Sequence, residues 1–127
     1  MVKTPYKIIL IVLLLFVLSA GGIFTYLKYF KEIPEVEVGN INLSQLEDGT
    51  YEGKYSVDLI NVVTRVEINN GQIRYIEILE HDNGLGGKAE RLIEDILSEQ
   101  SLNVDTVSGA TISSKAILKS VELALSK

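Results

Sequence analysis

The sequence predicts an α+β domain, in which two helices pack on a small antiparallel sheet, preceded by a single N-terminal transmembrane helix. Three observations predict this: a charge-free run over residues 8–27, apolar alternation on both sides of Asn70-Gly71, and two later segments with helical apolar spacing. Strands that adjoin in the sequence and are followed by helices are typical of α+β domains. The 127 residues have room for one small folded domain.

The charge-free run over residues 8–27 is expected to cross the cell membrane once. Its 20 residues, at a rise of about 1.5 Å each, match a hydrocarbon core about 30 Å thick. The short basic segment 1–7 favours a cytoplasmic N-terminus, which places the domain on the extracytoplasmic side. A cleaved signal peptide is the alternative, since small residues around Ala20 offer a cleavage point. The apolar run continues to Leu27, and this favours an uncleaved anchor.

Charge and composition narrow the possible functions. The first 31 residues carry four lysines and no acid, whereas the remainder carries eight basic and 17 acidic side chains, a net charge of −9. This charge disfavours nucleic acid as a partner, because phosphate backbones are negative as well. The chain has no cysteine and one histidine, His81, which argues against disulfides, thiolate chemistry, and zinc or iron–sulfur sites. No metal site is expected, and a redox role requires an organic cofactor.

The segment before the domain, residues 28–47, is predicted to be a juxtamembrane linker, because it shows no helical stripe longer than one turn. The domain is expected to span residues 48–127 and to begin with the turn signal Asp48-Gly49. A first strand over residues 50–57 follows, in which alternate residues share one face. These residues are Tyr51, Gly53, Tyr55 and Val57.

A β-hairpin is predicted next, from two runs rich in β-branched residues, 62–68 and 73–80. Asn70-Gly71 lies between them, and both residues tolerate the positive φ angles of a tight two-residue turn. After a glycine-rich loop at residues 84–87, the apolar spacing becomes helical. The first helix is expected to bury Ala89, Leu92, Ile93, Ile96 and Leu97, and the second to bury Ala116, Ile117, Val121, Ala124 and Leu125.

Residues 105–111 form the most informative motif, Asp-Thr-Val-Ser-Gly-Ala-Thr, and Ser113 and Ser114 follow closely. Serine and threonine before an apolar stripe are also ordinary helix-start signals, so a capped helix is one interpretation. The other interpretation is an anion site. If Thr111 begins the second helix, the amides of the first turn have no partner within the helix, and together with the helix dipole they favour a phosphate.

The motif resembles the covalent flavinylation signature of the FMN-binding domain family. The resemblance covers about residues 48–125, including Asp-Gly-Thr-Tyr-Glu-Gly at the start, the Asn-Gly hairpin and the Gly-Leu-Gly loop. Relatives include flavin-carrying subunits of sodium-pumping quinone reductases and Rnf complexes, and exported flavoproteins of extracellular electron transfer. In the respiratory subunits the segment before Gly-Leu-Gly reads like His-x-Glu-Thr-Pro. Here it reads His81-Asp82-Asn83, which indicates a compact single-domain member with a different loop.

The resemblance implies that Thr111 carries FMN through a phosphoester made by a separate flavin transferase. Gly109 and Ala110 keep the approach uncrowded. Ser108, Ser113 and Ser114 offer hydroxyls to the phosphate or to the helix start, and Asp105 fixes the loop or assists the metal ion of the transferase. Gly84, Leu85 and Gly86 border the flavin ring in one interpretation and form a simple turn in the other. His81 is expected to be a hydrogen-bonded surface group.

The implied function is a membrane-anchored electron carrier that passes electrons from a membrane redox donor to an exported acceptor. Thr111 is then an attachment point, with no catalytic residue expected. Two other classes remain open: an interaction or assembly module that binds FMN reversibly or not at all, and a small flavin-dependent reductase. A domain of about 80 residues leaves little room for a substrate pocket of several hundred cubic ångströms.

Overall fold

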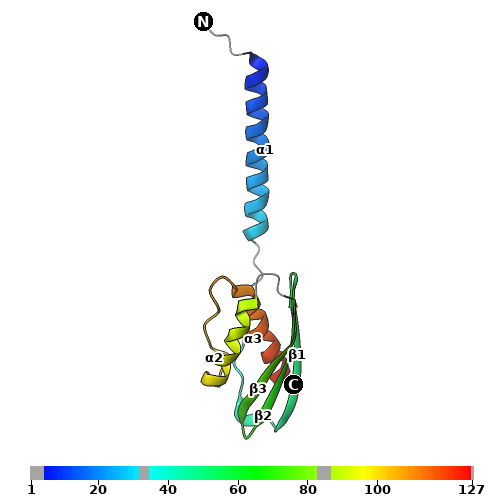
Figure 1. Ribbon diagram of the computed structural model, residues 1–127, viewed down its shortest axis with the longest axis vertical. Helices are drawn as coiled ribbons and strands as arrows, with labels where there is room; N and C mark the ends of the chain where they lie inside the picture. The colour runs from blue at the N-terminus through cyan, green and yellow to red at the C-terminus, as the bar shows by residue number, and fades with distance from the viewer. Residues whose placement is uncertain (1–4, 32–34, 83–86, 127) are drawn as a thin grey trace. The chain divides into compact units, whose positions relative to one another are not determined.

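The computed structural model describes residues 5–31, 35–82 and 87–126, and the chain divides into two compact units, residues 1–33 and 34–127. The first unit holds helix α1 (Tyr6–Lys31). The second holds strands β1 (Gly49–Val57), β2 (Ile60–Asn69) and β3 (Gln72–Asp82), followed by helices α2 (Leu92–Glu99) and α3 (Thr111–Leu125). Short 3₁₀ turns, η1 (Leu43–Gln45) and η2 (Gly87–Arg91), complete the second unit (Figure 1). The α+β prediction is confirmed.

Helix α1 is long and apolar enough to cross a membrane. Its 23 residues from Tyr6 to Lys28 have a mean hydropathy of 2.8, and none of the span is buried by the rest of the protein. Its serine and its threonine bond within the helix, Ser19 to the carbonyl of Phe16 at 2.8 Å and Thr25 to that of Gly21 at 2.9 Å. This internal pairing removes the cost of placing a hydroxyl in hydrocarbon. A signal sequence near the N-terminus can pass the same test of length and composition.

The three strands form one antiparallel sheet in the order β1-β2-β3. At the predicted β2–β3 turn, Asn70 and Gly71 have φ angles of 51° and 69°, which are the left-handed values of a tight hairpin turn. A second two-residue turn, Asp58-Leu59, joins β1 to β2, with Asp58 at a φ of 54°. The sequence does not mark this turn with a glycine, and no turn was predicted there.

One face of the sheet is polar and the other forms the core. Arg65 lies on the polar face between Glu52 at 2.8 Å and Glu77 at 3.1 Å, so that one ion-pair row crosses all three strands. The opposite face of β2 is fully apolar except for Thr64, and it packs against α3, which also crosses β1 (Figure 1). This division is common in antiparallel sheets with one solvated face.

Gly53 allows α3 to lie directly against β1. A Cβ atom at this position would lie 1.9 Å from the carbonyl oxygen of Ser120 and 2.5 Å from the backbone nitrogen of Ala124. Beside this contact, the buried hydroxyls of Thr64 and Ser120 are hydrogen bonded at 3.1 Å, and Ser120 donates onward to the carbonyl of Ile117. Two features therefore fix the position of α3 along the sheet: the absence of a side chain at Gly53 and the hydrogen bond between Thr64 and Ser120.

Helix α2 packs on the edge strand β3. It ends at Gln100, which adopts a left-handed φ of 52°, and the side-chain amide of Gln100 bonds both backbone groups of Ile73. The Ile73 N–H donates to Gln100 Oε1 at 2.7 Å, and Gln100 Nε2 donates to the Ile73 carbonyl at 2.9 Å. The predicted helix from Ala89 is present, although its first turn is the 3₁₀ segment η2.

Residues 35–47 belong to the folded unit, which extends it beyond the 48–127 expected from the sequence. Val36 is buried in the core, and Val38, Ile41, Leu43 and Leu46 pack against it. The N–H of Gly39 donates to Glu122 Oε2 at 3.0 Å. Apolar residues scattered among acids gave no periodic signal, yet these residues pack against the core of the domain. We refer to residues 35–42 as the strap.

Candidate functional site

The motif of residues 105–111 forms a tight turn that leads directly into α3. The N–H of Ala110 donates to the carbonyl of Val107 at 2.9 Å, and Gly109 has a φ of 77°. A four-residue turn with glycine in this conformation at its third position is of type II. Val107 and Ala110 are buried in the core, whereas Ser108 and Gly109 are exposed. The two ends of the turn are therefore anchored in the core, and the two residues between them face solvent.

Ser114 holds this turn from beneath. Its hydroxyl, fully buried in α3, accepts a hydrogen bond from the N–H of Val107 at 3.0 Å, while its own N–H donates to the carbonyl of Ala110. Ser113 is buried as well, at 2% exposure. Of the three serines that the sequence suggested as phosphate or capping groups, only Ser108 is exposed.

Thr111 is the first residue of α3 and its side chain is exposed. The residue before it, Ala110, makes no side-chain cap, and the first turn contains no acidic residue. The first amides of an α-helix have no partner inside the helix, and the dipole gives this end a partial positive charge. The helix start is therefore open to an anion, and the simple interpretation of a side-chain-capped helix does not describe it.

Lys88, which the sequence analysis did not select, lies beside the same turn. A Cβ atom on Gly109 would be 2.7 Å from Lys88 Nζ and 3.5 Å from its Cε. The lysine comes from η2, which packs against α3. No local pattern indicates this contact, because about 20 residues and a helix separate the two positions along the chain. The only feature of the sequence that could have pointed to Lys88 was its position directly after the glycine-rich loop.

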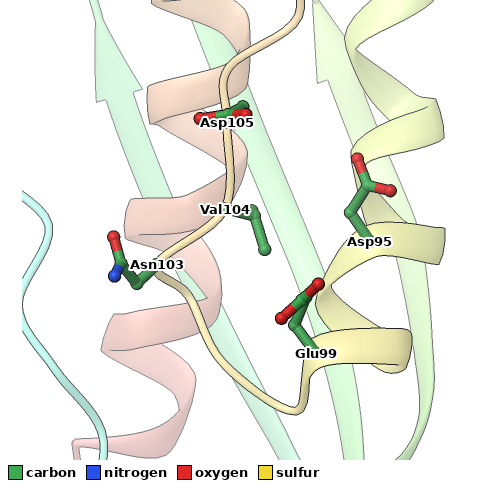
Figure 2. A pocket seen from close by; sticks show the side chains of 5 residues that line it. All are labelled: Asp95, Glu99, Asn103, Val104 and Asp105. Carbon is green, nitrogen blue, oxygen red and sulfur yellow. The ribbon is translucent and has the colours of Figure 1, made fainter.

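Asp105 lines an acidic cleft of about 290 Å³. Figure 2 shows Asp95 and Glu99 on the side of α2 that faces the loop carrying Asn103, Val104 and Asp105. Three carboxylates in one cleft repel a phosphate. Within the described ranges, no group of three or more histidine or acidic side chains is placed to hold a metal ion.

His81 is a buried hydrogen-bonded group at the end of β3. Its side chain is 2% exposed, and its Nδ1 lies 3.0 Å from Glu90 Oε1 in η2. The pair joins the two ends of the segment that contains Gly84, Leu85 and Gly86. Those three predicted site residues lie outside the described residues.

The fold and this corner define a class: a small α+β domain that presents a threonine hydroxyl at an open helix start beside a lysine. The model of the FMN-binding domain family matches residues 58–126, from the β1–β2 turn through α3, and the chain belongs to this family. No curated protein matched the chain. The chemistry of the corner fits the phosphate end of FMN, since an exposed threonine begins a helix without a side-chain cap, and the Lys88 ammonium lies beside Gly109, two residues earlier.

Proposed function

We propose that this protein is a membrane-anchored, exported flavoprotein that carries FMN covalently on Thr111 and acts as an electron-transfer module. The observation that carries the proposal is the exposed Thr111 side chain at the uncapped start of α3, directly after the Ser108-Gly109 turn. Membership of the FMN-binding domain family supports the choice of cofactor. Reversible binding would expose the cofactor to loss outside the membrane, and a phosphoester prevents that loss.

Attachment requires a separate flavin transferase that uses FAD. In this step the Thr111 oxygen forms a bond to the phosphorus of the FMN half, the pyrophosphate bond of FAD breaks, and AMP leaves. The hydroxyl proton passes to a base of the transferase. The product is a phosphodiester with one negative charge, placed where the α3 amides and dipole stabilise an anion.

After attachment, the protein holds the cofactor and the flavin supplies one- or two-electron chemistry. No residue of this chain takes part in a bond-making step during turnover. The domain would accept electrons from a membrane redox donor and pass them to an exported acceptor. An electron carrier needs an accessible cofactor edge and no substrate pocket, and the exposure of the Thr111 corner is consistent with this.

A flavin-dependent reductase is the weaker alternative. The acidic cleft and a second cleft beside Lys115 have volumes of about 290 and 250 Å³. Small-molecule sites usually measure about 300–1,000 Å³ and are mostly apolar. These clefts are therefore poor substrate sites. A flavin-free interaction module would explain the fold but gives no reason for an exposed threonine at an uncapped helix start.

The test is the intact mass and visible absorbance of the full chain, purified in detergent after co-expression with a flavin transferase. The expected result is a gain of one FMN less water, with yellow colour that survives denaturation and is lost in Thr111→Ala. Thr106→Ala, a change of the other threonine in the same loop, is the matched control and should keep the modification. An unmodified wild-type chain beside an active transferase would refute covalent attachment.

A further inference from the structure

Lys88 is positioned over the turn that precedes the attachment residue. Its Nζ atom lies so close to Gly109 that a single added carbon there would be 2.7 Å away. Thr111 follows Gly109 by two residues, and consecutive Cα atoms are about 3.8 Å apart. The Lys88 ammonium therefore lies on the same corner of the domain as the Thr111 residue, beside the turn that leads into α3.

The charge of Lys88 is not matched by a carboxylate. Elsewhere in the described domain, Arg65, His81 and Lys119 each lie beside an acidic partner at 2.8–3.1 Å, whereas Lys54, Arg74, Arg91 and Lys115 form no ion pair. Over the same described ranges, no carboxylate lies within ion-pair distance of Lys88. Acidic residues outnumber basic ones 17 to eight after residue 31. The Lys88 ammonium is therefore a positive charge beside the motif, in an acidic domain, and it is available to pair with an added anion.

Gly109 links the motif to this lysine. Its φ of 77° is the conformation that glycine adopts most readily, and the absence of a side chain leaves the space that Lys88 occupies. Any larger residue would displace the ammonium from the turn. The glycine of the motif therefore serves two purposes, since it shapes the turn and admits the cation.

We propose that Lys88 is a positioning residue for the phosphoester on Thr111. The ammonium pairs with the single negative charge of the phosphodiester. This contact fixes the direction in which the attached flavin extends from the start of α3. Charge-assisted hydrogen bonds of this kind are about twice as strong as neutral ones. The inference rests on the proposed attachment of FMN to Thr111, and its effect is expected only in the modified protein.

The test compares unfolding temperatures of the full chain in detergent, with and without co-expressed flavin transferase, for the wild type, Lys88→Ala, Lys88→Arg and Lys54→Ala. Lys54 is exposed on the polar face of the sheet and is the matched control. The flavin-dependent gain in unfolding temperature should fall by about 2–6 °C in Lys88→Ala. The gain should be retained in Lys88→Arg and Lys54→Ala, and added salt should reduce the difference between wild type and Lys88→Ala. Without transferase, Lys88→Ala and Lys54→Ala should unfold alike.

The intact mass of the wild type distinguishes a failure of the Lys88 inference from a failure of the proposed function. If the wild type is fully flavinylated but Lys88→Ala keeps the same flavin-dependent gain as Lys54→Ala, the role of Lys88 is refuted and the proposed function stands. If Lys88→Ala loses stability equally with and without flavin, its role is structural and the inference is also refuted. If the wild type remains unmodified beside an active transferase, the proposed function fails and the inference fails with it.

Discussion

At the scale of single residues, the motif divides into positions that build the turn and positions that face solvent. Val107, Ala110 and Ser114 are buried and bonded to one another through two backbone contacts and one hydroxyl contact. Thr111 is exposed. The sequence could identify Thr111 because its signature is local. It could not distinguish buried from exposed serines, since burial depends on how α3 packs on the sheet.

Replacement of Ser114 by alanine tests the part of the motif that builds the turn. The change leaves the buried Val107 N–H without its acceptor, which should lower the free energy of unfolding by about 1–3 kcal/mol. It should also reduce the yield of flavinylated chain, because the turn before Thr111 is less well ordered. Urea denaturation followed by tyrosine fluorescence, together with intact mass, would measure both effects. The exposed residue Ser108, changed to alanine, should leave stability within about 0.5 kcal/mol, and equal losses in the two variants would contradict the assignment.

At the scale of elements, the sequence predicted the regular structure well where turn chemistry is explicit. The Asn70-Gly71 hairpin is confirmed because both residues favour positive φ. The Asp58-Leu59 turn was missed because no glycine follows Asp58, and Asp-Gly is the usual signal of such a turn. The strap was interpreted as linker because its apolar residues have no period. Its contact with Glu122 joins positions 83 residues apart, and no local pattern carries such information.

The strap depends on the ionised form of Glu122. Burial alone would raise the pKa of this carboxyl, but hydrogen bonds from Lys119 and from the Gly39 N–H, together with the charge of Lys119, lower its pKa below the ordinary value. A lowered folded-state pKa means that the carboxylate stabilises the fold above the ordinary glutamate pKa. That contribution is lost as the pH falls through the lower, folded-state pKa.

Hydrogen exchange at the Gly39 amide would measure this dependence. After correction for the intrinsic exchange rate, protection of this amide should decrease as the pH falls through the folded-state pKa of Glu122. In Glu122→Gln the protection should be weak at all pH values, because the neutral amide cannot form the charge-assisted bond. Glu94→Gln, a change on an exposed position of α2, is the control. Protection in Glu122→Gln equal to that of wild type would show that apolar contacts alone hold the strap.

At the scale of the whole molecule, charge separates the two units of the chain. Lys3 and Lys7 precede the apolar run with no acidic residue beside them, whereas Lys28 and Lys31 follow it and lead into a remainder with a net charge of −9. Cytoplasmic segments that flank membrane helices are enriched in lysine and arginine. The same acidity keeps the domain from binding anionic lipid headgroups. An extracytoplasmic domain is therefore the orientation that we propose.

The absence of native cysteine makes this orientation directly testable. Leu59, at the tip of the β1–β2 turn, is 86% exposed and accepts a cysteine without loss of core packing. In intact cells, Leu59→Cys should react with a maleimide that cannot cross membranes, and Ala116→Cys, in the core of α3, should react only after denaturation. Labelling of Leu59→Cys only after lysis would reverse the proposed topology.

The membrane anchoring that we propose would hold many copies of this protein in one plane, and the contact of Gln100 with Ile73 affects how such copies meet. An edge strand with free backbone groups is a template on which a neighbouring chain can add a strand. Here the Gln100 amide bonds both backbone groups of Ile73, and two register shifts interrupt the β2–β3 pairing nearby. Molecules confined to two dimensions meet one another often. Because the backbone groups of Ile73 are already bonded, this position of the β3 edge is not available to a colliding neighbour, which disfavours strand addition there.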